Sequence, residues 1–388
     1  MTSPVSEPQM ERTEQSPMMS KDKIFYRNKN QLEEYVSYDI FDACKKLYWT
    51  IIRRPVLSLH IIKVLVNSLS LSIKLHYIKI NSSHKSIIVV CCVQSLGDII
   101  SAEPVARVAR REMPGTEIVW CCREDFRDIV RTFADVDRIV TIRCATEWAF
   151  TSRMTKTINK IDLQISNNLL CNKCWAKLLK YGKGNAINSN NYYQQRNLLA
   201  AQCLAAGIRP IEESPCLVPD ANAVAVVDGL DLPRYFVVVH CASNEVSRDW
   251  RAEHWRDLAR YLAERRGIHV VEVGLKSIAT LDRCDRSRSL CGLLSVLETA
   301  EVIRRAALFI GIDSGPAHIA HAVGTRGVIL LGAYRNFKRY TPYSGAYGDG
   351  RLAELVRAEG PVSELDVAPV IEAVDRGLAS SRGDGGTQ

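Results

Sequence analysis

The 388-residue sequence predicts an α/β fold of two Rossmann-like domains that face each other across a cleft, preceded by a basic helical extension. Two observations carry this prediction. Short apolar runs rich in β-branched residues alternate with helical segments, and the alternation occurs twice, from Ser86 and again from Tyr235. The length also suits two domains better than one. In such domains, ligand sites lie beyond the carboxyl ends of the parallel strands.

The segment before the first alternation does not resemble a targeting signal. Residues 1–30 are polar and are predicted to form a disordered leader, without the basic start and apolar stretch of a secretory signal. Apolar spacing from Ile40 to Ile52 predicts an amphipathic helix, whereas the alternation from Leu69 to Tyr77 favours a strand over a continued helix. The longest charge-free apolar run, Val64 to Ile73, is shorter than the about 20 residues of a spanning helix, so we expect none.

Positive charge is concentrated in two segments of a chain whose formal net charge is +8. Between Ala43 and Lys85 there are eight basic residues and no acid, and between Arg153 and Lys183 there are seven basic residues against Asp162 alone. The remainder of the chain is acidic. This distribution predicts a localised anionic partner, such as nucleic acid, an anionic membrane surface or a phosphorylated lipid.

The 13 cysteines are expected to be thiols in a reducing cytoplasm. Cys91, Cys92, Cys121 and Cys122 fall inside predicted strands, where free cysteine behaves as a small buried hydrophobe. The Cys171-Asn172-Lys173-Cys174 segment has metal-binding spacing but no second pair and no nearby histidine, so we predict no metal site.

The alternating pattern places each element. In the first half it predicts strands beginning at Ser86, Thr116 and Asp137, and helices over Ile99–Arg111, Glu124–Phe133 and Tyr193–Ala206. In the second half it predicts strands YFVVVHC, IHVVEVG, ALFIGI and GVILLG, and helices over Glu253–Arg265, Ser295–Arg305 and Pro316–Val323. The resulting organisation is a leader (1–30), a basic amphipathic extension (31–85), an N-terminal domain (86–213), a linker (214–234), a C-terminal domain (235–360) and a C-terminal helix and tail (361–388).

The first candidate site is the turn Ser95-Leu96-Gly97-Asp98, which directly follows the first strand. Gly97 permits a tight turn, and Asp98 is placed at the carboxyl end of the sheet near the start of a helix. An acid in this position also serves as an N-terminal capping residue. Its place at a strand's carboxyl end favours a function beyond capping.

The second candidate site spans Gly311 to His318. A strand ends here, small and polar residues turn, and Pro316 opens a helix whose exposed amides suit a diphosphate. Asp313 and Ser314 either cap this helix or contact a ligand, and His318 lies within its first turn. The order Gly-x-x-Ser-Gly differs from the Gly-x-Ser-x-Gly elbow, which excludes a serine hydrolase of that type.

The third candidate site runs from His240 to Trp255. Ser243 and Asn244 offer donors in the loop after a strand, and Arg248 offers a fixed cation for phosphate. We expect Trp255 to pack in the core, whereas Trp250 fits either a core or a site position.

Together these three segments resemble the ADP-heptose:lipopolysaccharide heptosyltransferase family, glycosyltransferase family 9. The family's Gly-Asp turn resembles Ser95–Ile99, and its middle signature resembles His240–Trp255. Its strongest signature, Asp-Ser/Thr-Gly followed by His, resembles Asp313–His318, with a weaker echo at Thr341-Pro342-Tyr343. The resemblance extends from about Ile87 to Leu331, with the motifs in the same order.

The resemblance implies a GT-B fold and an inverting, metal-independent transfer of a heptose or similar sugar from a nucleotide diphosphate donor, ADP-heptose, without a cofactor. By position, Asp98 matches the family's base and Asp313 the acid that holds the donor sugar. Arg248 stands where the best-known members have Lys, and the loop Leu275–Ile278 lacks an acid that some members place against the ribose. The implied donor-binding residues are Ser243, Asn244, Arg248, Asp313, Ser314, Gly315 and His318.

The implied acceptor is an anionic glycolipid of lipopolysaccharide type or another cell-envelope glycan. The basic residues Lys45, Lys46, Arg53 and Arg54 are expected to contact it or a membrane surface, which places the protein in the cytoplasm, peripheral to the inner face of the membrane. Packing of this helix on the next domain is the alternative. Other interpretations are transfer to a protein adhesin, nucleotide-sugar binding without turnover, and nucleic-acid binding. We expect no nucleic acid, because the basic segments lack interleaved aromatic residues.

One further acidic motif carries no predicted role. Asp135-Val136-Asp137 is the only Asp-x-Asp tripeptide, of the kind that holds a metal in other transferases, but it precedes the third strand in a predicted turn. We expect it to be a solvated connector.

Overall fold

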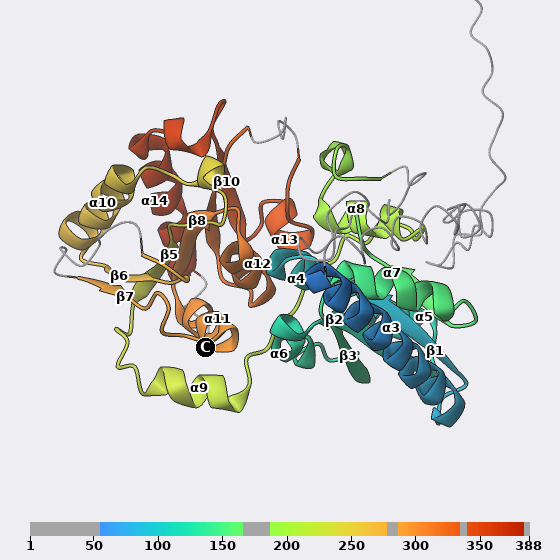
Figure 1. Ribbon diagram of the computed structural model, residues 1–388. Coiled ribbons are helices and arrows are strands. Elements are labelled where there is room, and N and C mark those ends of the chain that lie inside the picture. Colours follow the sequence, from blue (N-terminus) through green and yellow to red (C-terminus); the bar gives the residue numbers. More distant parts are fainter. Residues whose placement is uncertain (1–54, 166–186, 278–285, 334–339, 384–388) are drawn as a thin grey trace, which may run out of the picture.

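The computed structural model describes residues 55–165, 187–277, 286–333 and 340–383. Several predictions lie outside these residues: the leader, the helix over Ile40–Ile52 with its basic residues Lys45, Lys46, Arg53 and Arg54, and the cysteine pair Cys171 and Cys174. Within the described part, the chain forms two parallel sheets, each covered by helices (Figure 1). The predicted α/β class and GT-B architecture are confirmed.

The N-terminal sheet has four strands in the order β3-β2-β1-β4. These are β1 (Ser86–Cys91), β2 (Thr116–Arg123), β3 (Arg138–Ile142) and β4 (Asn159–Asp162), all parallel. In the central strands nearly every side chain is buried, as expected for a sheet covered on both faces. Cys91 pairs in register with Cys121, and the cysteines of both central strands are buried free thiols, as predicted.

Helices cover the two faces of this sheet unequally. On one face lie α3 (Pro55–Asn81) and α7 (Ala145–Met154), which bury Leu75 and Trp148 against β1 and β2. The other face carries α4 (Leu96–Ser101), α5 (Pro104–Glu112), α6 (Arg127–Arg131) and α8 (Leu198–Ala205). The single helix predicted over Ile99–Arg111 is therefore wrong. It breaks at Ala102 and Glu103 because Pro104 has no amide hydrogen to continue the ladder.

The predicted strand over Leu69–Tyr77 is also wrong, because α3 is helical throughout this stretch. Its alternating pattern arises from two separate apolar rows on opposite sides of the helix. One row packs on the sheet and includes Leu71, Leu75 and Ile78. By length and composition, Leu59–Asn81 could cross a membrane, in contrast to the sequence prediction, yet 39% of its most apolar window is buried inside the protein. Length and composition alone are weak evidence for a membrane span, since a core helix passes the same test.

The C-terminal sheet has six parallel strands in the order β10-β9-β8-β5-β6-β7. They are β5 (Phe236–His240), β6 (His269–Glu272), β7 (Ser287–Ser289), β8 (Leu308–Ile312), β9 (Gly327–Leu331) and β10 (Ala353–Arg357). Its helices are α9 (Ala221–Asp228), α10 (Ala252–Arg260), α11 (Val296–Arg305), α12 (Gly315–Ala322), α13 (Gly345–Gly348) and α14 (Val367–Gly383). Trp250 and Trp255 pack edge to face in the core of this domain, which assigns the undecided Trp250 to packing.

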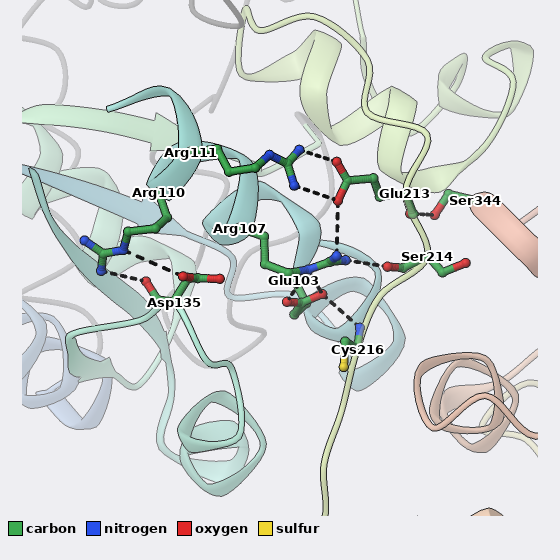
Figure 2. A network of polar contacts seen from close by, with 9 residues as sticks. All are labelled: Glu103, Arg107, Arg110, Arg111, Asp135, Glu213, Ser214, Cys216 and Ser344. Carbon is green, nitrogen blue, oxygen red and sulfur yellow. Dashed lines mark hydrogen bonds and ion pairs between the residues drawn. The ribbon is translucent and has the colours of Figure 1, made fainter. Parts of the chain in front are cut away.

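A polar network ties the linker to both domains (Figure 2). Arg107 on α5 contacts the buried Glu103 at 2.9 Å and Glu213, which directly precedes the linker, at 3.1 Å. Its guanidinium also donates to the carbonyl of Ser214, the first linker residue. From the opposite side, the Ser344 hydroxyl donates to the Glu213 carbonyl at 2.8 Å. The start of the linker is thus held between α5 and the segment that precedes α13.

Candidate functional site

The site lies where the amino-terminal ends of α4 and α12 meet, between the two sheets (Figure 1). Two glycines allow this approach. A Cβ atom on Gly97 would lie 2.6 Å from Cδ2 of His318, and one on Gly315 would lie 3.0 Å from the Leu96 side chain. No side chain fits at Gly97 without displacing the buried imidazole. The first and second predicted segments are therefore brought together.

Asp98 occupies the first turn of α4 and is held by groups of its own domain. The backbone N–H of Ser95 donates to Asp98 Oδ2 at 3.0 Å, and the Ser95 hydroxyl donates to the same oxygen. In the amide orientation that satisfies both of its atoms, Gln94 donates to Oδ1 at 2.9 Å. The capping interpretation is thus correct in part, since Ser95 and Asp98 form a capping box.

The electrostatics of Asp98 suit a proton acceptor. Burial raises the pKa of its carboxyl, although the Ser95 hydrogen bonds and the nearby His318 and Arg248 pull in the opposite direction. A carboxylate with a raised pKa is a stronger base than one in water.

Three groups surround Asp313 at the end of β8. Arg248 Nη1 lies 3.6 Å from Asp313 Oδ2, and the same nitrogen donates to the Asp313 carbonyl at 3.4 Å. The Tyr343 hydroxyl donates to Oδ1 at 3.2 Å, and His318 Nε2 is 4.0 Å from that oxygen. The third predicted segment therefore reaches the second through Arg248.

The side chain of His318 is buried, and this burial favours its neutral imidazole form. Burial lowers the pKa of its imidazole, despite the neighbouring carboxylates of Asp313 and Asp98. In the described structure Nδ1 has no hydrogen-bond partner, and the ring packs against that of Tyr343 at 4.9 Å between centroids. His318 thus bridges the two domains by packing on Gly97.

The start of α12 provides backbone donors beside these side chains. Ser314 is its N-cap, but its hydroxyl donates to the Ile312 carbonyl at 3.1 Å and accepts no hydrogen bond from the helix. Pro316 has no amide hydrogen, and the Ala317 amide donates to the Ser314 carbonyl at 3.1 Å, so Gly315 carries the first amide of the helix. The helix dipole favours an anion at this end. This geometry fits the predicted diphosphate site.

The loop that follows β5 is arranged around Ser243. Its hydroxyl donates to the Glu245 carbonyl at 2.7 Å and accepts from the Glu245 amide at 3.0 Å, while Asn244 is exposed. Asp249 fixes the same loop by accepting from the Ser243 amide at 2.8 Å. Ser243 therefore shapes the loop that presents Arg248, and its predicted contact with the donor stays a prediction.

Sequence reasoning missed two residues that support Asp98. Gln94 contacts the carboxylate, and the buried Gln202 of α8 donates to the Asp98 carbonyl at 3.0 Å. Gln94 could have been noticed as a polar residue at a strand end. Gln202 has no sequence signal, because its helix packs against α4 only in the folded chain.

Both acids of the Asp-x-Asp tripeptide make contacts within the N-terminal domain. Asp137 Oδ2 accepts from Arg110 at 2.6 Å and from the Ile118 amide at 2.6 Å, and Asp135 lies 3.7 Å from Arg110. The predicted connector does precede β3, with Asp137 exposed and Asp135 half-buried, but contacts with Arg110 also tie both acids to α5. Across the described ranges, no group of three or more His, Cys, Asp and Glu residues could hold a metal ion.

Solved structures with a similar fold include glycosyltransferases of family 9. A glycosyltransferase family 9 protein from Veillonella parvula is 16% identical, with a TM-score of 0.59 over 76% of this chain and 98% of its own. E. coli heptosyltransferase WaaC with ADP gives 17% identity and a TM-score of 0.53 over 75% of this chain and 99% of its own. This chain therefore shares their fold, two parallel α/β domains in the GT-B architecture.

Sequence comparisons identify the kind of glycosyltransferase that this chain resembles. Residues 212–353 match the model of glycosyltransferase family 9 (heptosyltransferase). Lipopolysaccharide heptosyltransferase 1 of Pseudomonas aeruginosa is 23% identical over 66% of this chain and 80% of its own length. Lipopolysaccharide heptosyltransferase 3 of Escherichia coli is 37% identical over 24% of this chain and 30% of its own. These matches support a glycosyltransferase of the heptosyltransferase type, with the family model covering residues 212–353 of this chain.

Proposed function

We propose that this enzyme transfers a heptose, with inversion and without a metal ion, from ADP-heptose to a lipopolysaccharide-type acceptor of the cell envelope. The observation that carries the proposal is the meeting of Asp98 and the α12 amino terminus from opposite domains, with Gly97 against His318. ADP and an ADP-heptose analogue are the ligands of the solved WaaC structures, which have the same fold. This similarity supports the choice of donor.

In the proposed reaction Asp98 accepts the proton of an acceptor hydroxyl while that oxygen attacks the anomeric carbon of the heptose. A new glycosidic C–O bond forms as the bond from the anomeric carbon to the phosphate oxygen breaks, and the nucleoside diphosphate leaves with its electron pair. Attack from the face opposite the leaving group inverts the configuration.

The departing diphosphate gains negative charge, which the chain can stabilise from two directions. α12 begins three residues after the end of β8, so its positive amino-terminal end lies near Asp313, and Arg248 lies 3.6 Å from that carboxylate. Asp313, fixed by Tyr343, is positioned to accept a hydrogen bond from a sugar hydroxyl. These groups supply the charge complementarity that metal-dependent transferases obtain from an Asp-x-Asp site.

Asp98→Asn tests the role of the base. We expect kcat to fall about 10²- to 10⁴-fold, the typical contribution of a general base, with donor affinity nearly unchanged. Turnover is followed with labelled ADP-heptose, and binding is followed by the rise in unfolding temperature that ADP-heptose causes. Turnover close to that of the wild type would refute Asp98 as the base.

The acceptor class is tested separately. Labelled donor is incubated with the enzyme and a cell lysate, and the label is traced to lipid or to protein. Label in glycolipid supports the proposal, and it would place the enzyme at the cytoplasmic face of the inner membrane. Label in an adhesin would replace the glycolipid acceptor with a protein, and leave the donor chemistry unchanged.

A further inference from the structure

The helix α3 presents a second apolar row to solvent, opposite the row that packs on the sheet. The exposed row runs from Leu59 to Ile80 and includes Ile62, Val66, Leu69 and Ile73, each at least 49% exposed. These residues are three or four positions apart, so they share one face of the helix. The buried row lies on the other side, where Leu71 and Leu75 contact β1 and β2.

This row is a continuous surface and not scattered exposure. Of the fifteen exposed large hydrophobic side chains in the described residues, seven belong to α3. Single exposed hydrophobics are ordinary, whereas a contiguous apolar patch marks an interaction site. The outer face of α3 therefore requires a partner.

The charge beside the row indicates the chemistry of that partner. Lys63 and Lys74 are exposed on the helix, and no acidic residue occurs within Pro55–Asn81. Lys79, near the end of the helix, instead donates to the Thr157 carbonyl at 2.8 Å. Lys74 also lines a groove of about 340 Å³ between α3 and β3, together with Tyr77 and Arg138. A second copy of this helix would bring like charges together. An anionic partner with an apolar interior complements both features.

We propose that the outer face of α3 is a docking surface for an anionic lipid bilayer, on which the helix lies in the plane of the membrane. The buried row anchors α3 to the sheet, so the helix lies along the bilayer and does not cross it. The apolar row enters the boundary between headgroups and acyl chains, and the lysines meet the lipid phosphates. The inference rests on the proposed function only in that it places the enzyme beside a membrane-borne acceptor.

The test is sedimentation of the full-length protein with vesicles of equal parts phosphatidylglycerol and phosphatidylcholine, compared with pure phosphatidylcholine. We expect stronger binding to the anionic vesicles and weaker binding as salt is raised. The double variant Ile62→Asn/Ile73→Asn should bind about tenfold more weakly or worse, because both apolar side chains face the bilayer. Lys74→Ala should bind roughly fivefold more weakly, the loss expected for one surface lysine.

Matched controls come from the opposite domain. Val226 on α9 is 45% exposed and Arg265 is exposed, so Val226→Asn and Arg265→Ala change the same properties away from α3, and both should bind like the wild type. Unchanged unfolding temperatures would show that the variants fold. Equal binding of the α3 variants and the controls would overturn the proposal. Detection of a dimer that the double variant abolishes would also overturn it, in favour of self-association.

Different variants test the proposed catalytic function and the proposed docking surface, so one proposal can be refuted without the other. The α3 variants should transfer heptose normally to a detergent-solubilised acceptor, whereas Asp98→Asn should bind vesicles normally and not transfer. If no variant or wild-type protein transfers heptose, the proposed function is wrong, and the vesicle result still decides the docking surface.

Discussion

At the scale of the residue, the site depends on what is missing as much as on what is present. Gly97 has no side chain, and the imidazole of His318 occupies that space. His318 cannot move away freely, because it packs on Tyr343 and lies beside Asp313. Gly97 thus fixes the distance between the helix that carries the proposed base and the helix that faces the diphosphate.

Replacing Gly97 with alanine should therefore displace α4 from α12. We expect transfer to fall about 100-fold, the cost that misplacing reacting groups by about 1 Å can have, while the fold is retained. Gly229→Ala is the control, because a Cβ atom there meets its closest atom at 3.4 Å. Steady-state kinetics measures the transfer rate, and far-ultraviolet circular dichroism checks that the variant is folded. Normal turnover of Gly97→Ala would show that catalysis does not need the close packing of Gly97 on His318.

The raised pKa of Asp98 also predicts a cost in stability. Because burial disfavours the charged carboxylate, the folded state holds the proton more tightly than the unfolded state does. The penalty is absent below the unfolded pKa, near 3.8, and grows as pH rises through the folded value. Asp98→Asn should accordingly unfold at a higher temperature than the wild type at pH 7, with the gap closing near pH 3.5. Calorimetry at both pH values measures this, and a lower unfolding temperature of the variant at pH 7 would contradict it.

At the scale of the element, the sequence predicted the buried strands better than the helix boundaries. The predicted strands are short runs of buried β-branched residues, which composition identifies. The more exposed strands β4, β7 and β10 lack such runs and were missed. The helix predicted over Ile99–Arg111 fails at Pro104, and α3 was misinterpreted because two apolar rows on opposite faces imitate a strand. A helix with hydrophobic residues on both faces has the same two-residue alternation as a strand, so periodicity alone could not identify α3 as a helix.

The linker network provides a prediction at this scale. Glu103 is 2% exposed, and burial raises the pKa of its carboxyl even though Arg107 lies beside it. Removing the guanidinium by Arg107→Met leaves a buried acid without its partner, which we expect to destabilise the fold by about 3 kcal/mol or more.

The comparison is Arg376→Met, which breaks the exposed ion pair with Glu354. An exposed pair contributes about 0 to 1 kcal/mol, so this variant should unfold nearly like the wild type. Urea unfolding of both variants provides the measurement. If both variants lost a similar amount of unfolding free energy, the contacts of Arg107 would stabilise the fold no more than an exposed ion pair does.

At the scale of the whole molecule, the order of motifs was enough to predict which segments form the site. Each segment follows a strand, and parallel strands bring their carboxyl ends to one edge of a sheet. What the sequence could not provide is the contact across the domains. The approach of Gly97 to His318 and the support of Asp98 by Gln202 depend on packing between elements far apart in the chain.

The four buried cysteines in and directly after β1 and β2 determine how the N-terminal domain reacts with thiol reagents. Their side chains alternate between the two faces of the sheet, and all are sealed beneath helices, whereas Cys216 in the linker is exposed. A thiol reagent therefore meets the linker at once and the sheet only when the sheet opens. The rate at which the buried thiols are modified therefore measures how often the N-terminal domain unfolds, and the exposed Cys216 in the linker gives the rate for an accessible thiol.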